Sequence, residues 1–232
     1  MTAHRWLGLW LLATACGAGA APNSGPWVSP ALANQSLEAA LPSRFEVRLK
    51  DGSTIGLGNC AELVRLDATI VEESSGNNVG AKAFQSARVQ CQALAALKTL
   101  QRARRSLLPA TPETKGLAAA LKSAAPALMY LSISDDSERE VRQAQERGLA
   151  LKQFRPNTVF RQTASDSARI EVDDTLQDVK LLARGDFNAD GAEDWLLRVD
   201  SQVAQGSYGS SGLWLVTRLQ AKGPWRVLRR WP

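Results

Sequence analysis

The spacing of apolar residues changes along this chain, and this change limits the folds that it can adopt. Between residues 81 and 108, apolar side chains recur every three or four positions, which is typical of a helix with one buried face. After about Ala168 they fall in five short β-like runs separated by turn residues: 170–172, 179–183, 195–199, 213–219 and 225–228. We therefore expect an α+β fold, with a helical amino-terminal portion that includes a hairpin, followed by a small Trp-rich antiparallel β-sheet.

Shorter signals divide the amino-terminal portion. Residues 44–57 predict a β-hairpin around Asp51-Gly52, and Asn59 followed by Glu62 predicts a capped helix that ends near Leu66. Further helices are expected from Thr111 to before Pro126 and over 135–154, with a strand over 128–133 between them. The resulting division is a linker over 22–42, an α+β portion over 43–160 and a β portion over 168–232.

The first 21 residues have the layout of a secretory signal peptide. Arg5 precedes an apolar run from Trp6 to Ala15, and small residues follow. This run is about half of the ~20 residues that a membrane-spanning helix needs. Two processing interpretations stay open: cleavage after Ala20, or a bacterial lipoprotein in which Cys16 is acylated. We therefore expect a periplasmic or secreted protein, with an outer-membrane lipoprotein as the alternative.

The cysteines support export. Cys16 is either removed or acylated, so Cys60 and Cys91 remain as a pair in an oxidising compartment. We predict a disulfide between them that attaches the helix carrying Cys91 to the segment that begins at Cys60. Two buried thiols are the alternative.

The histidine content and the net charge restrict the kinds of catalysis and of binding partner that we expect. The single histidine, His4, lies in the predicted signal, which excludes His-dependent catalysis and His-ligated metal sites from the mature chain. The net formal charge is +5, and arginines cluster over 102–105 and 226–230. Export makes nucleic acid an unexpected partner, so we expect a protein or an anionic envelope polymer, unless the basic face is simply solvated. The segment 206–212 is interpreted as a hairpin connection, with a binding loop using Tyr208 as the alternative.

One loop carries metal chemistry. Residues 186–194 read Asp-Phe-Asn-Ala-Asp-Gly-Ala-Glu-Asp, and oxygen-bearing side chains occupy loop positions 1, 3, 5 and 9: Asp186, Asn188, Asp190 and Asp194. Gly191 allows a sharp turn, and Ala192 can offer its carbonyl oxygen. Three carboxylates and an amide select Ca²⁺ over zinc or copper, and without an ion the carboxylates would repel one another. A metal-free Asx-rich turn is the alternative.

The stretch from Gly185 to Asp194, continued by a strand to Val199, resembles the calcium loop of FG-GAP or VCBS-type repeats, which occur in extracellular β-propellers and adhesins. The resemblance implies four side-chain ligands and one carbonyl ligand: Asp186, Asn188, Asp190, Asp194 and Ala192. It covers only residues 185–199, and a propeller needs several blades, so no propeller is expected. Leu197 stands where an EF-hand requires a glutamate.

These observations predict an exported, non-enzymatic, calcium-binding envelope protein with a binding or structural role. The alternative is a carboxylate-based hydrolase of cell-wall or surface saccharide, which needs no histidine. Two acids facing each other across a cleft, roughly 5 to 9 Å apart, would favour the hydrolase. An inhibitor of a secreted enzyme also fits the size of the chain.

Overall fold

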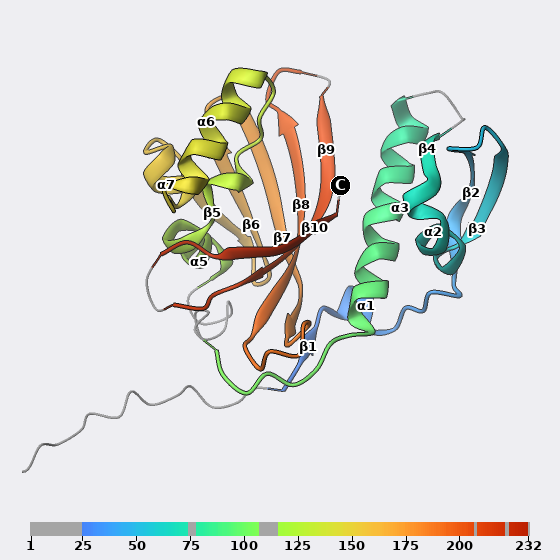
Figure 1. The fold of residues 1–232 in the computed structure, drawn as a ribbon, viewed down its shortest axis with the longest axis horizontal. Coiled ribbons are helices and arrows are strands. Elements are labelled where there is room, and N and C mark those ends of the chain that lie inside the picture. Colours follow the sequence, from blue (N-terminus) through green and yellow to red (C-terminus); the bar gives the residue numbers. More distant parts are fainter. Residues whose placement is uncertain (1–24, 74–77, 107–115, 207, 221–222, 232) are drawn as a thin grey trace, which may run out of the picture.

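The computed structural model describes residues 25–73, 78–106, 116–206, 208–220 and 223–231 (Figure 1). Its main feature is a seven-stranded antiparallel sheet with the order β10-β9-β8-β7-β6-β5, to which β1 adds by pairing with β7. The strands of this sheet are β1 (Trp27–Val28), β5 (Val159–Ala164), β6 (Ser167–Val172), β7 (Thr175–Gly185), β8 (Asp194–Val203), β9 (Gly209–Thr217) and β10 (Arg226–Trp231).

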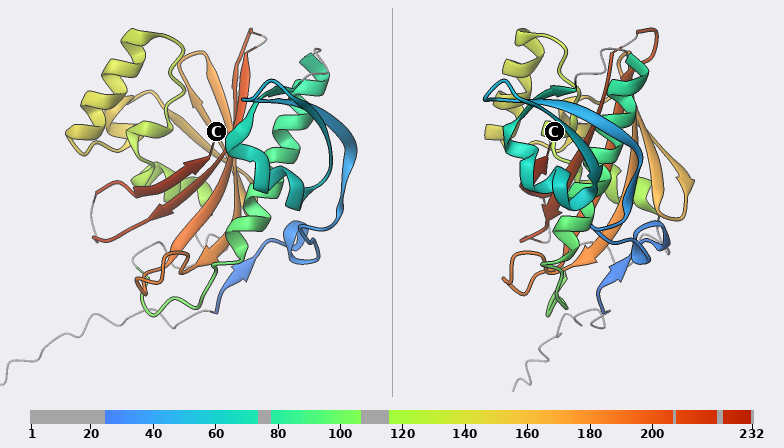
Figure 2. Two further views of the ribbon diagram at one scale, coloured as in Figure 1. Left: turned by 45° about the vertical axis from the view of Figure 1, so that its right-hand side comes forward. Right: turned by 90° about the vertical axis from the view of Figure 1, so that its right-hand side faces the viewer.

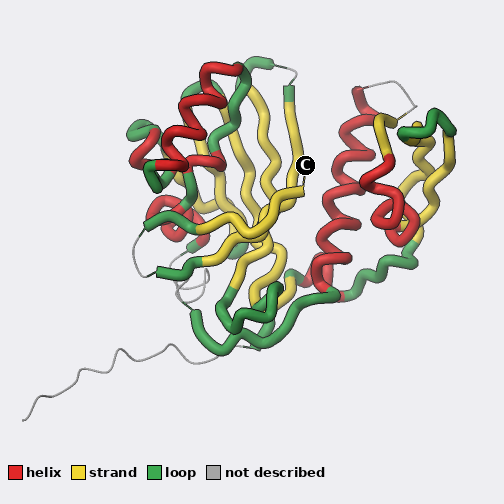
Figure 3. Tube along the Cα trace, viewed as in Figure 1, coloured by secondary structure: helices red, strands yellow, loops and turns green. Residues whose placement is uncertain are grey.

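The expected fold class is wrong. The protein is mostly β (Figure 3), with 40% of its residues in strands and 31% in helices. The helices are spread through the chain. All five alternating runs after Ala168 are strands, but the sheet also recruits β5 and, from the other end of the chain, β1. A two-residue strand such as β1 carries no readable period, because alternation needs at least four residues to be seen.

One face of the main sheet is covered by three helices, α5 (Leu117–Ala124), α6 (Asp135–Glu146) and α7 (Leu151–Phe154). The 3₁₀ turn η2 (Ala127–Met129) lies between α5 and α6. The core on this face contains Trp195 and Trp225, whose rings meet edge to face with centroids 5.3 Å apart. The predicted strand over 128–133 is therefore η2 and coil. The predicted helix over 135–154 is divided into α6 and α7 at Gly148, which has a positive φ of 65°.

The opposite face packs against α3 (Asn78–Leu97) and a small unit formed by α2 (Cys60–Leu66), the 3₁₀ turn η1 (Asp67–Thr69) and a three-stranded sheet (Figure 2). The order of this sheet is β3-β2-β4, with β2 Ala40–Leu49, β3 Thr54–Asn59 and β4 Ile70–Glu73. The predicted hairpin is confirmed by the pairing of β2 with β3. Part of the predicted linker forms β1, α1 (Pro30–Ala33) and the start of β2.

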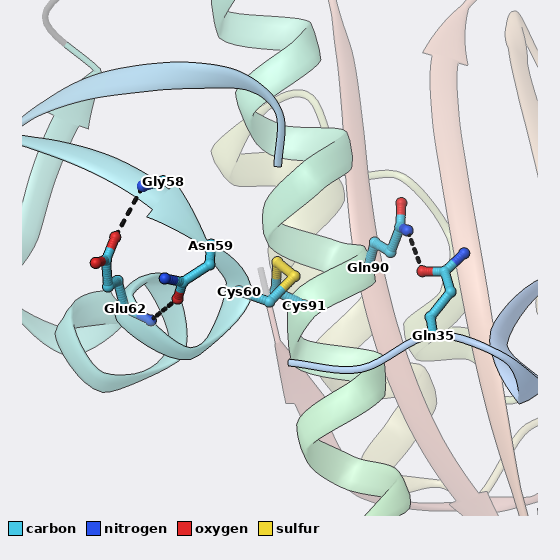
Figure 4. Close-up of a disulfide and its surroundings, with 7 residues drawn as sticks. All are labelled: Gln35, Gly58, Asn59, Cys60, Glu62, Gln90 and Cys91. Carbon is cyan, nitrogen blue, oxygen red and sulfur yellow. Dashed lines mark hydrogen bonds between the residues drawn. A yellow bond between two sulfur atoms is a disulfide. The ribbon is translucent and has the colours of Figure 1, made fainter. Parts of the chain in front are cut away.

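The predicted disulfide joins Cys60 to Cys91, with 5.0 Å between their Cα atoms (Figure 4). Both half-cystines are buried in the core shared by α2 and α3. The predicted cap is also present, because Asn59 Oδ1 accepts a hydrogen bond from Glu62 N at 2.9 Å. Glu62 in turn accepts one from Gly58 N. The disulfide therefore attaches α2 to the middle of α3.

The predicted signal peptide over 1–21, Cys16 and the expected helix start at Thr111 lie outside the described residues. In the part of the chain that the structure describes, no helix is long and apolar enough to cross a membrane. Helix α3 ends at Leu97, well before the predicted residue 108. The reason lies in what residues 101–105 contact instead.

Candidate metal centre

The predicted calcium loop connects β7 to β8, the two central strands of the main sheet. Gly185 and Asp194 are cross-strand partners, so the loop between them is closed at its base by the sheet. Two of its residues have left-handed backbones, Ala189 at φ 63° and Gly191 at φ 80°. Such a conformation is unusual for alanine, and non-glycine residues held in it concentrate at functional sites.

Three side chains of the loop bond to backbone N–H groups two residues ahead. Asp186 Oδ1 accepts from Asn188 N at 3.2 Å, and Asn188 Oδ1 accepts from Asp190 N at 3.2 Å. Asp190 Oδ1 accepts from Ala192 N at 2.7 Å. These are successive Asx turns, which wind the loop tightly with or without an ion. Asp186 Oδ2 also accepts from Gly191 N at 2.7 Å, which draws the two ends of the turn together.

Asp194 is the exception among the loop's side chains. It is fully buried, and although its Oδ2 accepts from Phe187 N at 3.1 Å, its Oδ1 is buried without a hydrogen-bond partner. Burial, with the nearby charges of Asp190 and Asp186, raises the pKa of Asp194 to about 6, although the Phe187 N–H and the Thr217 hydroxyl both lower it. A buried carboxylate oxygen without a partner is costly, so it needs a proton or a cation.

A second segment holds the loop from outside. Residues 101–105, which follow α3, form two isolated bridges to it: Gln101 with Asp186 and Arg105 with Ala192. Both Arg104 N and Arg105 N donate to Gly191 O, at 2.8 and 3.0 Å. We call residues 101–105 the clamp segment. Its backbone groups are used by the loop, which is why α3 does not continue through it.

Gly185 permits this close approach. A Cβ atom added there would lie 2.4 Å from Leu100 Cδ1 and 2.7 Å from Gln101 O, which is closer than Cβ atoms come. Phe187 anchors the other side of the loop, because its side chain is buried in the core beneath α3. The sequence analysis missed the clamp segment, since its arginines indicated only a basic surface. The glycine before the acidic loop was the one available signal.

The structure places all five predicted ligands within this one loop. Asp186 is buried beside Asp194, while Asn188 and Asp190 lie at its exposed tip, where Asn188 Nδ2 donates to Asp190 Oδ2 at 3.1 Å. Among the described residues, no three His, Cys, Asp or Glu side chains are arranged as a metal site. The donor set itself is oxygen only, which is the type that Ca²⁺ prefers.

Comparisons with known proteins give no family for this chain. No protein-family model, no curated protein and no solved structure matches it. The likeness of the loop to FG-GAP and VCBS-type repeats therefore stays a prediction from its residues. Function must be inferred from the geometry of the protein itself.

Proposed function

We propose that this protein is an exported binding protein of the bacterial envelope whose central hairpin is stabilised by one calcium ion. The observation that carries the proposal is the unpartnered Oδ1 of the fully buried Asp194 at the base of an acidic loop. A calcium ion would compensate the negative charges of Asp190 and Asp186 that act on Asp194. The left-handed backbone of Ala189 also supports the proposal, because strained backbone of this kind concentrates at ligand-binding sites.

The ligands proposed are the side chains of Asp186, Asn188, Asp190 and Asp194 and the carbonyl oxygen of Ala192. The ion would supply charge neutralisation and no redox or acid–base chemistry. Because Gly191 O is bonded to the clamp segment, a loop fixed by calcium would also fix the chain that follows α3. The role of the ion is therefore structural, and it would hold the central strands and α3 in one arrangement.

Export is supported by the disulfide between Cys60 and Cys91, since disulfides persist in oxidising compartments and are rare in the cytosol. The signal-like segment over 1–21 points to the same compartments. We propose a periplasmic or secreted location, with an outer-membrane lipoprotein if Cys16 is acylated.

A binding role is favoured over the saccharide hydrolase by the acids of the groove that η2, α6 and strands β7 to β9 line. The acids that line it, Asp135 and Glu138, both belong to the first turn of α6, and Glu138 is paired with Arg142 at 2.8 Å. Residues three apart on a helix lie on the same side, so these two acids do not face each other across the groove. The opposed carboxylate pair that the hydrolase requires is not present among the described lining residues.

The test is a thermal melt of the purified protein with calcium and with chelator. We expect calcium to raise the melting temperature by several degrees, because binding to the folded state stabilises it by mass action. Asp190→Ala should abolish this difference, since it removes one proposed calcium ligand, an exposed carboxylate, without opening a cavity. Asp136→Ala, which removes an exposed acid from α6, is the matched control and should keep it. Identical melts of the unchanged protein in calcium and chelator would refute the proposal.

A further inference from the structure

A groove of about 980 Å³ lies on the face of the main sheet that carries α6, away from the calcium loop. Its floor is formed by β7, β8 and β9, and its wall by the segment from η2 into α6. Arg230 of β10 and Tyr208, from the connection between β8 and β9, complete its rim. The volume is at the upper end of the range for small-molecule sites, which suits a ligand of several linked units.

The floor of the groove contains a buried hydrogen-bond acceptor without a donor. Gln177 is 1% exposed, and its Nε2 donates to Met129 O at 2.6 Å, which fixes the orientation of the amide. Its Oε1 has no hydrogen-bond partner. An unpaired buried acceptor is costly, so a ligand that brings an O–H or N–H donor to this position would be favoured.

The rim offers apolar surface beside this polar floor. Tyr208 is 54% exposed and Ile133 is 62% exposed, although large apolar side chains of the other lining residues are mostly covered. Trp214 lies on the floor, with the Arg230 guanidinium stacked 4.7 Å from its ring centroid. The groove thus presents the exposed ring of Tyr208 and the side chain of Ile133, and Ser201 and Ser210 are among its lining residues.

The charges of the groove balance. Its charged lining residues are two acids, Asp135 and Glu138, and two arginines, Arg142 and Arg230. Arg142 is paired with Glu138, and Arg230 is stacked on Trp214. An anionic or cationic ligand would therefore meet no surplus of opposite charge. A neutral ligand is favoured.

From these features we propose that the groove binds a neutral oligosaccharide. A sugar ring has outward hydroxyl groups that can donate to Gln177 Oε1, and apolar C–H faces that can pack on Tyr208. An added peptide strand is less suited, because β9 is already paired with β10 over residues 213–217 and Ser211 O accepts a hydrogen bond from Gln85 Nε2 of α3 at 2.8 Å. This inference names the ligand of the binding role proposed above and depends on that role, but not on calcium.

The experiment titrates the protein with neutral tetrasaccharides of glucose and of N-acetylglucosamine, and follows tryptophan fluorescence and heat. We expect at least one of them to bind with a Kd below about 10 mM, which is within the range of weak but specific binding. Tyr208→Ala should weaken binding at least tenfold, and Gln177→Met should do the same. Leu219→Ala, which removes an exposed apolar side chain outside the groove, is the matched control and should bind as the unchanged protein does.

Three results would overturn the inference: no tetrasaccharide binds, binding is unaffected by Tyr208→Ala, or an apolar or peptide probe binds in their place. Tyr208 is exposed, so its replacement is expected to leave folding intact and the test does not depend on the buried Gln177. The titration is repeated in chelator. Sugar binding without a calcium effect on melting would reject the metal proposal and keep this one, and the reverse result would reject only the groove.

Discussion

At the scale of single residues, Asp194 and Tyr130 differ in how their polar atoms find hydrogen-bond partners. Asp194 Oδ1 has no partner, whereas the Tyr130 hydroxyl donates to Asp173 Oδ2 at 2.8 Å. Arg155 completes the second group by lying over the Tyr130 ring, 4.9 Å from its centroid, and by pairing with Glu140. The second cluster pairs its charges within itself, and its buried Arg155 Nε, which has no hydrogen-bond partner, still lies 3.5 Å from Asp173 Oδ2.

The Tyr130 hydroxyl makes stability depend on alkaline pH. Burial, together with the hydrogen bond to Asp173 and the charge of that residue, raises the pKa of Tyr130 above its ordinary value near 10. The folded state therefore keeps this proton longer than the unfolded state does. Its contribution is fully present below pH ~10 and is lost as the pH rises through the higher folded pKa.

We expect the free energy of unfolding to fall more steeply between pH 9 and pH 11 in the unchanged protein than in Tyr130→Phe. Urea unfolding at a series of pH values measures both slopes. Tyr208→Phe, which alters the chain's other tyrosine, is the control and should keep the steeper slope. Equal slopes for the unchanged protein and Tyr130→Phe would show that this hydroxyl ionises as it does in the unfolded chain.

At the scale of elements, the end of α3 and the base of the calcium loop depend on one glycine. Gly185 brings the backbone of β7 against Leu100 and Gln101, and any larger residue would push these apart. The bridge between Gln101 and Asp186 lies next to this contact. Loss of the contact would therefore disturb the clamp segment and the loop together.

Gly185→Ala is expected to destabilise the protein by about 1 to 3 kcal/mol, as overpacking of a tight contact does. Denaturant unfolding measures the change. Gly25→Ala is the matched control, because a Cβ atom at Gly25 would meet nothing within 4 Å. If both variants unfold alike, the approach of residues 100–101 to Gly185 is not part of the stable fold.

The elements also show how far sequence reasoning reaches. Strands β6 to β9 were predicted because each buries at least one face and stands out locally as an apolar run between turn residues. Strand β10 was predicted from the same kind of run, although none of its residues is fully buried. The end of α3 was not predicted, because the apolar spacing continues through Leu97 and Leu100. The backbone of residues 101–105 is instead hydrogen-bonded to the calcium loop. The residue types of the candidate site were predicted from spacing. Its clamp segment was not, because that contact joins chain segments far apart in sequence.

At the scale of the whole molecule, one sheet separates two cores. Buried residues of β7 to β9 contribute to both: Leu181 and Trp195 pack on the side of α5, and Leu182 and Leu196 on the side of α3. A strand buried on both faces shows a continuous apolar run, such as Trp195-Leu-Leu, in place of clear alternation. This is why the sequence predicted a small sheet with one core of its own, and missed the second face on which α3 packs.

The disulfide strengthens the second core. Joining Cys60 to Cys91 closes a loop of 31 residues, which in the chain-entropy model stabilises the fold by roughly 3 to 4 kcal/mol. We expect the double variant Cys60→Ala, Cys91→Ala to melt roughly 10 °C below the oxidised protein, measured by circular dichroism. Reductant should lower the melting temperature of the unchanged protein and leave that of the variant as it was. A reductant-insensitive melt of the unchanged protein would contradict a stabilising bond.

The pairing of β1 with β7 sets the order in which the chain can finish folding. Trp27 and Val28 emerge from the ribosome early, yet their strand partners, Arg184 and Ala183, are synthesised near the end. Until those residues follow, neither the central hairpin nor the layer that α3 covers can close, and long-range antiparallel pairing is slow to form. The main sheet can therefore be completed only after the chain has been made past Arg184.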